Sequence, residues 1–129
     1  MPKRVLVVED DPAASRFVGY TLEQEGYEVS IASNGLEGIM KAQQEKPDIL
    51  VLDGMLPGLD GFQVCRRLRA QAETAKLPIL MVSAKAQEAD KAAGLKVGAD
   101  DYLAKPVDPT KLVERVRELL NRQESTQAV

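Results

Sequence analysis

Histidine is absent from this chain of 129 residues, which excludes imidazole acid–base chemistry and histidine-ligated metal sites. A single cysteine, Cys65, excludes an internal disulfide and favours an intracellular compartment, which we expect to be the cytoplasm. Cys65 falls in a helical pattern beside Val64 and Leu68. We therefore expect it to be a small core residue rather than a reactive thiol.

Long apolar runs and a strong net charge are also missing. No segment approaches the ~20 apolar residues that span a bilayer, and no signal peptide is recognisable, so we expect no membrane role. The net charge of −3 argues against direct nucleic-acid binding. What is present, 44% hydrophobic and 29% charged residues, suits one domain with a buried core.

Short apolar runs alternate with longer amphipathic segments along the chain. We expect strands at "RVLVV", "YEVSIA", "DILVLD", "PILMVS" and "DYLA". The first, third and fourth are nearly continuous apolar runs, which is typical of parallel strands covered on both faces. Helix start signals lie between them, because Asp11 and Asp108 each precede a proline and Asn34 begins a capping-box pattern.

These elements make five βα units, which predicts an α/β fold with a doubly wound parallel sheet. Ligands of such sheets bind at the carboxyl ends of the strands. We expect helices near 61–72 and 87–97, and a last helix that ends near Asn121. The domain is expected over 1–122, and 123–129 is expected to be a disordered tail or the start of a linker.

Polar side chains stand at the carboxyl ends of four expected strands: Glu9, Asp10, Asp11, Asp53, Ser83 and Lys105. These ends share one edge of a parallel sheet, so we expect the side chains to lie together, with Asp11 as a helix N-cap. The carboxylates offer the hard oxygen ligands that Mg²⁺ prefers, and the cation would offset their clustered charge. A lysine and a hydroxyl beside them complete a cradle for a phosphoryl group, with Asp53 as the candidate nucleophile.

Four segments resemble the receiver (CheY-like) domain of bacterial two-component response regulators: "VLVVEDD", "DILVLDGMLPGLDGFQVCRRLR", "PILMVSAK" and "GADDYLAKPVDPTKLVERVRELL". The resemblance runs from about Lys3 to Arg122. It implies a flavodoxin-like (βα)5 sandwich with strand order 2-1-3-4-5. It also implies a phosphoryl-accepting signalling switch, which takes its phosphoryl group from the phosphohistidine of a sensor histidine kinase or a phosphotransfer protein.

The resemblance assigns a metal role to four positions. Asp10 and Asp53 would ligate Mg²⁺ (or Mn²⁺) directly, and the backbone carbonyl of Met55 would be a further ligand. Glu9 would act mainly through bound water. Asp53 would be the phosphoacceptor, and phosphotransfer and autodephosphorylation would be self-catalysed, so we do not expect an enzyme with a separate substrate.

The resemblance also assigns residues to the phosphoryl group and to the switch. Lys105, followed by Pro106 in a cis peptide bond, would contact the phosphoryl oxygens. The Ser83 hydroxyl and the Ala84 backbone N–H would bind the same group. Tyr102 would turn inward as Ser83 moves toward the phosphate, and this movement would change the face formed by the fourth helix, fifth strand and fifth helix.

Several positions leave questions open. Ser83 replaces the threonine that is commoner in the family, and Met55 and Lys85 lie where side chains affect the hydrolytic water, so the phosphoryl lifetime is not assigned. The segments "GADDYLAKP" and "ELLNR" resemble receivers of winged-helix transcription factors, which dimerise through charged residues that would here be Asp100, Asp101, Arg115 and Arg117.

Lys91 and Lys111 oppose that dimer, because they would place like charges where the subfamily tends to have an Arg–Glu pair. The chain is therefore expected to be a monomer or a phosphorylation-dependent dimer. It would be either a stand-alone receiver or one excised from a longer protein with a C-terminal output domain. The cognate kinase and the downstream target are not specified.

Three other functions fit the sequence less well. A hydrolase of the haloacid dehalogenase type would need a second acid where Met55 stands. A flavin- or nucleotide-binding module would need a glycine- or hydroxyl-rich loop after the first strand, where "EDDPAAS" is acidic. An unphosphorylated pseudo-receiver, acting as a constitutive protein-interaction module, remains the alternative, although such domains usually lack one of the key residues retained here.

Overall fold

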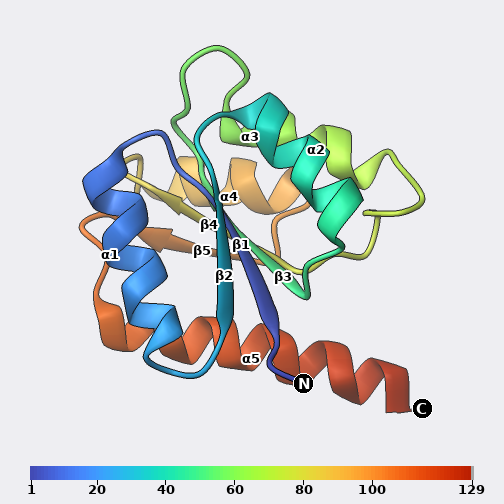
Figure 1. Cartoon of the computed structure of the whole chain (residues 1–129). Helices are drawn as coiled ribbons and strands as arrows, with labels where there is room; N and C mark the ends of the chain where they lie inside the picture. The colour runs from blue at the N-terminus through green and yellow to red at the C-terminus, as the bar shows by residue number, and fades with distance from the viewer. Residues whose placement is uncertain (129) are drawn as a thin grey trace.

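Five strands and five helices alternate along the chain, as seen in a computed structural model that describes residues 1–128 (Figure 1). Each expected strand is followed by an expected helix. The elements are β1 (Arg4–Val8), α1 (Pro12–Glu23), β2 (Glu28–Ala32), α2 (Gly35–Glu45), β3 (Ile49–Asp53), α3 (Gly61–Arg69), β4 (Ile79–Ser83), α4 (Glu88–Lys96), β5 (Asp101–Ala104) and α5 (Pro109–Ala128).

The five strands form one parallel sheet in the order β2-β1-β3-β4-β5, which confirms the predicted flavodoxin-like topology. Helices α1 and α5 cover one face, and α2, α3 and α4 cover the other (Figure 1). The strands end in register, with Val8 beside Leu52 and Ser83 beside Ala104. The polar residues that end or follow these strands are thereby brought to one edge of the sheet.

Two hydrophobic clusters, one on each face, hold the sheet between its helices. All five residues of β3 are buried, and its alternating side chains enter both clusters. Leu50 and Leu52 pack under α2 and α3, while Ile49 and Val51 pack under α1 and α5. Each such side chain contributes about 1.5–3 kcal/mol when it is fully buried, which explains why the central strands are almost entirely apolar.

The helix starts follow the predicted caps. Side-chain oxygens of Asp11 and Asp108 accept hydrogen bonds from backbone N–H groups in the first turns of α1 and α5. Asn34 accepts from the Glu37 N–H at 2.8 Å. The Glu37 carboxylate accepts from the Ser33 N–H rather than from that of Asn34, so the predicted capping box is displaced by one residue.

Two helix ends differ from the expected positions. Helix α3 ends at Arg69 rather than near residue 72, and the Thr74 hydroxyl donates to the Leu68 carbonyl oxygen in the turn that follows. Helix α5 continues past Asn121 to Ala128, because no proline or glycine interrupts a run rich in helix-forming residues. The backbone of 123–128 is thus helical, whereas a linker role for 123–129 stays a prediction and Val129 lies outside the described residues.

The Arg69 guanidinium joins the loops at the amino ends of β4 and β5. It donates to the carbonyl oxygens of Leu77 at 2.7 Å and Gly98 at 2.9 Å, and to the Asp100 carboxylate at 3.0 Å. The same Asp100 oxygen accepts from the Ile79 N–H at 2.8 Å. One side chain therefore joins the segments that precede β4 and β5, at the end of the sheet opposite the polar edge.

None of the helices within residues 1–128 has the length and apolar character that a membrane span requires. Cys65 is fully buried in the cluster under α3, as predicted from its position in the helical pattern. Burial raises the pKa of its thiol to about 11. The cysteine is a core residue of the fold and takes no part in the polar edge.

We expect Cys65 to resist a chromogenic thiol reagent at pH 8 in the native protein. With a pKa of about 11, about one thiol in a thousand is ionised at that pH, and the thiolate is the reactive form. In urea the same cysteine should react roughly 100-fold faster or more, since exposure returns its pKa to the ordinary range. Equal rates in the two conditions would show that Cys65 is not held in the core.

Candidate functional site

Three carboxylates meet at the carboxyl edge of the sheet. Glu9 and Asp10 follow β1, and Asp53 ends the neighbouring strand β3. Each offers an oxygen, and these oxygens all lie within 4.8 Å of one another. Glu9 and Asp53 are buried, whereas Asp10 is exposed. The structure thus brings together the acids that the sequence predicts, and their hard oxygens suit a divalent cation such as Mg²⁺.

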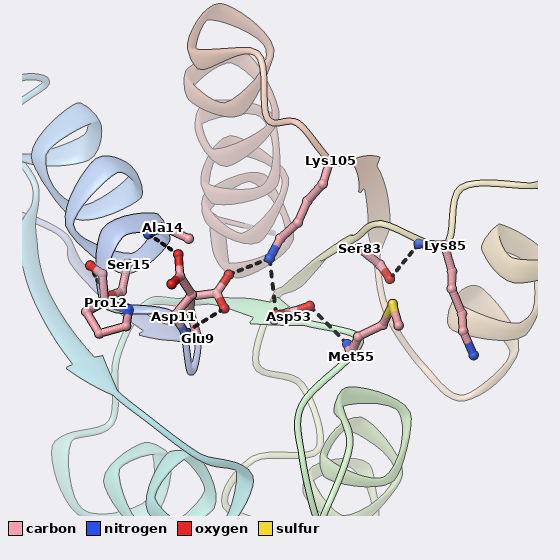
Figure 2. Close-up of polar contacts among 10 residues, drawn as sticks. All are labelled: Glu9, Asp11, Pro12, Ala14, Ser15, Asp53, Met55, Ser83, Lys85 and Lys105. Carbon is pink, nitrogen blue, oxygen red and sulfur yellow. Dashed lines mark hydrogen bonds and ion pairs between the residues drawn. The ribbon is translucent and has the colours of Figure 1, made fainter.

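Lys105 is the cation of this site. Its Nζ atom lies 2.6 Å from Glu9 Oε1 and 3.2 Å from Asp53 Oδ2. Figure 2 draws both contacts. Burial alone would lower the pKa of Lys105, but the hydrogen bond to Glu9 and the nearby charge of Asp53 raise it above its ordinary value. The lysine therefore stays charged and offsets part of the negative charge.

The ionised form of Glu9 is disfavoured in this cluster. Burial raises the pKa of Glu9 above its ordinary value of 4.5, and this effect exceeds the opposing hydrogen bonds from Lys105 and from the Asp11 N–H. Asp53 adds to the rise through its negative charge. A second cation bound among the carboxylates would relieve this repulsion.

This raised pKa predicts how stability depends on pH. Without metal, folded Glu9 binds its proton more tightly than unfolded Glu9, so its contribution to stability is lost as pH rises from 4.5 through the raised pKa. We expect Glu9→Gln to remove this loss. The unfolding free energy of the variant should therefore increase relative to that of wild type as the pH rises toward neutral. Urea unfolding in EDTA at several pH values checks this, and a difference that shrinks as pH rises would contradict it.

The β3–α3 loop holds Asp53 from the other side. The Met55 N–H donates to Asp53 Oδ1 at 2.9 Å (Figure 2). Gly61, the first residue of α3, lies so close that a Cβ atom there would be 2.2 Å from the Asp53 carbonyl oxygen. Sequence reasoning missed this role of Gly61, although the glycines of "DGMLPGLDG" were a visible signal for close backbone approach.

Ser83 and Tyr102 are joined through the backbone of Lys85. The Lys85 N–H donates to Ser83 Oγ at 3.1 Å, and the Tyr102 hydroxyl donates to the Lys85 carbonyl oxygen at 2.6 Å. Ser83 is fully buried and Tyr102 is 6% exposed. Ala84 is exposed at the end of β4, next to this link. Ser83 and Tyr102, the hydroxyl and aromatic residues expected to form the switch, are therefore both hydrogen-bonded to the backbone of Lys85.

The remaining predicted feature lies at the end of β5. The peptide bond between Lys105 and Pro106 is cis. The Lys105 N–H donates to the Ser83 carbonyl oxygen at 2.9 Å, so the residues that follow β4 and β5 stay adjacent. Glu9 and Asp10 after β1, Ser83 at the end of β4 and Lys105 after β5 thus gather at the edge of the sheet where Asp53 ends β3. This arrangement can bind a cation and hold a phosphoryl group against a carboxylate nucleophile.

A doubly wound α/β domain with this polar edge belongs to the class of domains that accept a phosphoryl group on a carboxylate. The response regulator receiver domain family matches residues 5–117. The chain belongs to this family and is a receiver domain of two-component response regulators, a phosphoacceptor in signalling.

Known relatives agree with this assignment. The chain is 48% identical over 124 residues to the alkaline phosphatase synthesis transcriptional regulatory protein PhoP of Bacillus subtilis, covering 96% of this chain and 51% of PhoP. It is 43% identical over 117 residues to the protein PilH of Pseudomonas aeruginosa, covering 91% of this chain and 97% of PilH. The chain spans about half the length of the first curated relatives that it matches, but nearly all of PilH.

A solved structure shows the same fold with a metal. It is the receiver domain of a sensor histidine kinase from Pseudomonas aeruginosa, with a magnesium ion coordinated in its active site cleft. The match has a TM-score of 0.87 and 30% identity, and it covers 94% of this chain and 99% of that domain. Together with the three clustered acids, it points to Mg²⁺ binding by this chain.

Proposed function

We propose that Asp53 is the residue that accepts the phosphoryl group. The observation that carries this proposal is its central place, since β3 lies between β1 and β4. Glu9 and Asp10 therefore stand on one side of Asp53 and Ser83 on the other, while Lys105 reaches its carboxylate at 3.2 Å.

We also propose how the cation would be held. Asp10 and Asp53 would ligate Mg²⁺ through carboxylate oxygens, the Met55 carbonyl would be a further ligand, and Glu9 would act through water. Mn²⁺, which accepts the same kinds of oxygen ligand, would also serve. The bound cation would supply neutralising charge for the phosphoryl oxygens.

In the proposed transfer, an Asp53 carboxylate oxygen attacks the phosphorus of a phosphohistidine. The new P–O bond forms as the P–N bond breaks, and the imidazole of the donor leaves. Lys105, the Ser83 hydroxyl and the Ala84 N–H would hold the phosphoryl oxygens. Hydrolysis of the product by water, again at this site, would end the signal.

An apolar cavity lies beside the site. A cavity of about 420 Å³ lies between α1 and the residues that follow β5, and Asp53 and Lys105 form part of its wall. Its other walls are mainly apolar side chains, including Phe17, which is 44% exposed. We infer that the donor is a sensor histidine kinase or a phosphotransfer protein, in the cytoplasm, and that the downstream target or C-terminal output domain is a separate unit.

The charged residues suggested for a dimer are already paired within one chain. Asp101 binds Arg115, Asp100 binds Arg69, and Arg117 binds Glu25. Lys91 and Lys111, in contrast, form no ion pair with any residue in the described part of the chain. These observations favour a monomer, with a phosphorylation-dependent dimer through α4, β5 and α5 as the alternative.

The intact mass of the protein after incubation with acetyl phosphate tests the proposed chemistry. We expect the mass to increase by one phosphoryl group when Mg²⁺ is present and to stay unchanged in EDTA, because the acids need the cation before they can admit a phosphate. A folded protein that gains no mass with Mg²⁺ would instead favour the pseudo-receiver, a constitutive protein-interaction module.

A further inference from the structure

The side chain of Tyr102 lies directly against a glycine of α4. A Cβ atom built on Gly94 would lie 2.7 Å from Cδ2 and 2.9 Å from Cε2 of the Tyr102 ring. These distances are shorter than real Cβ contacts. The same Cβ would make only an ordinary contact of 3.5 Å with Met81 Sδ. The ring therefore occupies the space that any other residue at position 94 would fill.

Helix α4 has little else to fix it. Gly94 is its only fully buried residue, and Leu95 beside it is 51% exposed. The contact between the backbone at Gly94 and the Tyr102 ring is thus a principal attachment of α4 to the sheet. The ring in turn is held by the hydrogen bond from its hydroxyl to the Lys85 carbonyl oxygen.

We propose that the space at Gly94, where a side chain is missing, is the seat that holds the Tyr102 ring in its buried position. Gly94 is then a positioning residue, and the seat sets the equilibrium between the buried and the exposed position of the ring. A cavity of about 230 Å³ beside Tyr102, on the face formed by α4, β5 and α5, gives the ring room to leave the seat. Rotation of the Tyr102 side chain about χ1 relieves the clash without moving the backbone of α4.

The seat matters for signalling because Tyr102 and Ser83 share the backbone of Lys85. This consequence rests on the proposed function, in which Ser83 binds the phosphoryl group. If phosphorylation favours the buried ring by some factor, then a change that expels the ring must weaken binding at the phosphoryl site by up to that factor. Gly94 would therefore act on the site through Tyr102 without contacting it.

Carbon-13 NMR of tyrosine-ring-labelled protein tests the position of the ring directly. The chain has three tyrosines, and the Tyr102 signal is identified by its loss in Tyr102→Ala. We expect a soluble gadolinium chelate to broaden this signal strongly in Gly94→Ala and weakly in wild type. Gly19→Ala is the matched control, because Gly19 is also a buried helical glycine but has only 3.6 Å contacts for a new Cβ. A ring that stays shielded in Gly94→Ala would overturn the proposal.

A thermal-unfolding cycle covers the case in which the variant folds poorly. Alanine favours a helix over glycine, so Gly19→Ala should raise the Tm by a few degrees. Gly94→Ala should lower the Tm in the wild-type background but raise it in Tyr102→Ala, where no ring is displaced. The same change in Tm in both backgrounds would overturn the proposal.

The link to the phosphoryl site is tested with beryllofluoride, a phosphoryl analogue, in the presence of Mg²⁺. We expect Gly94→Ala to weaken its binding several-fold and Gly19→Ala to leave it unchanged. If the Tyr102 ring is exposed in Gly94→Ala but the affinity for beryllofluoride is unchanged, the proposed link to the phosphoryl site is overturned. If wild type itself neither binds beryllofluoride nor gains phosphoryl mass, the proposed function fails, while the NMR and unfolding experiments still decide whether Gly94 seats the ring.

Discussion

Asp53→Asn is expected to abolish the Mg²⁺-dependent mass gain from acetyl phosphate. The amide has nearly the shape of the carboxylate, so it can keep the hydrogen bond from the Met55 N–H. It lacks the anionic oxygen that attacks phosphorus, and it removes one of the three acids around the cation site. Intact-mass spectrometry, with a urea-unfolding curve to show that the variant is folded, measures the effect.

Asp60→Asn is the matched control for this substitution. Asp60 caps α3 through its side chain, and asparagine caps helices about as well as aspartate. This variant should gain phosphoryl mass like wild type. A folded Asp53→Asn protein that is still modified would show that another residue is the acceptor, and peptide mapping would identify it.

Lys105→Ala should destabilise the metal-free protein by about 2–3 kcal/mol. Removing one partner of a buried ion pair costs about 3–5 kcal/mol, and we take a smaller value because 27% of the Lys105 side chain is exposed. Its loss leaves Glu9, whose side chain is 6% exposed, beside Asp53 without a counter-charge. Mg²⁺ should restore much of the lost stability, since it supplies positive charge to the same carboxylates.

Urea unfolding in EDTA and in Mg²⁺ measures this effect. Lys111→Ala is the control, because Lys111 is exposed and forms no ion pair with the described residues, so its removal should change stability by less than about 0.5 kcal/mol. A Lys105→Ala protein as stable as wild type in EDTA would show that the lysine does not neutralise the acids. In the proposed switch, the same variant would also separate phosphorylation from output.

The gathering of the acids could be predicted from sequence for a simple geometrical reason. Glu9, Asp10 and Asp53 follow apolar runs of the kind that parallel strands require, and the carboxyl ends of such strands share one edge. The positions of Ser83 and Lys105 follow from the same rule. Periodicity and strand ends thus determine which residues meet, whatever the details of their packing.

Contacts that depend on side-chain packing could not be predicted in this way. The seat of Tyr102 on Gly94 depends on a rotamer and on where α4 crosses the sheet. Arg69 and Asp100 are separated by 31 positions, and neither belongs to a pattern that would pair them. From the sequence, Asp100 was expected to contact a second subunit, whereas in the structure it forms an ion pair with Arg69 of the same chain.

The bonds of Arg69 hold the loops before β4 and β5 more firmly than α4, the helix that connects these two strands. A single guanidinium fixes both loops, whereas α4 is attached to the sheet mainly through Gly94 and the Tyr102 ring. A displacement at the proposed phosphoryl site that reaches Tyr102 through the Lys85 backbone can therefore move α4, while the loops bound by Arg69 keep their positions.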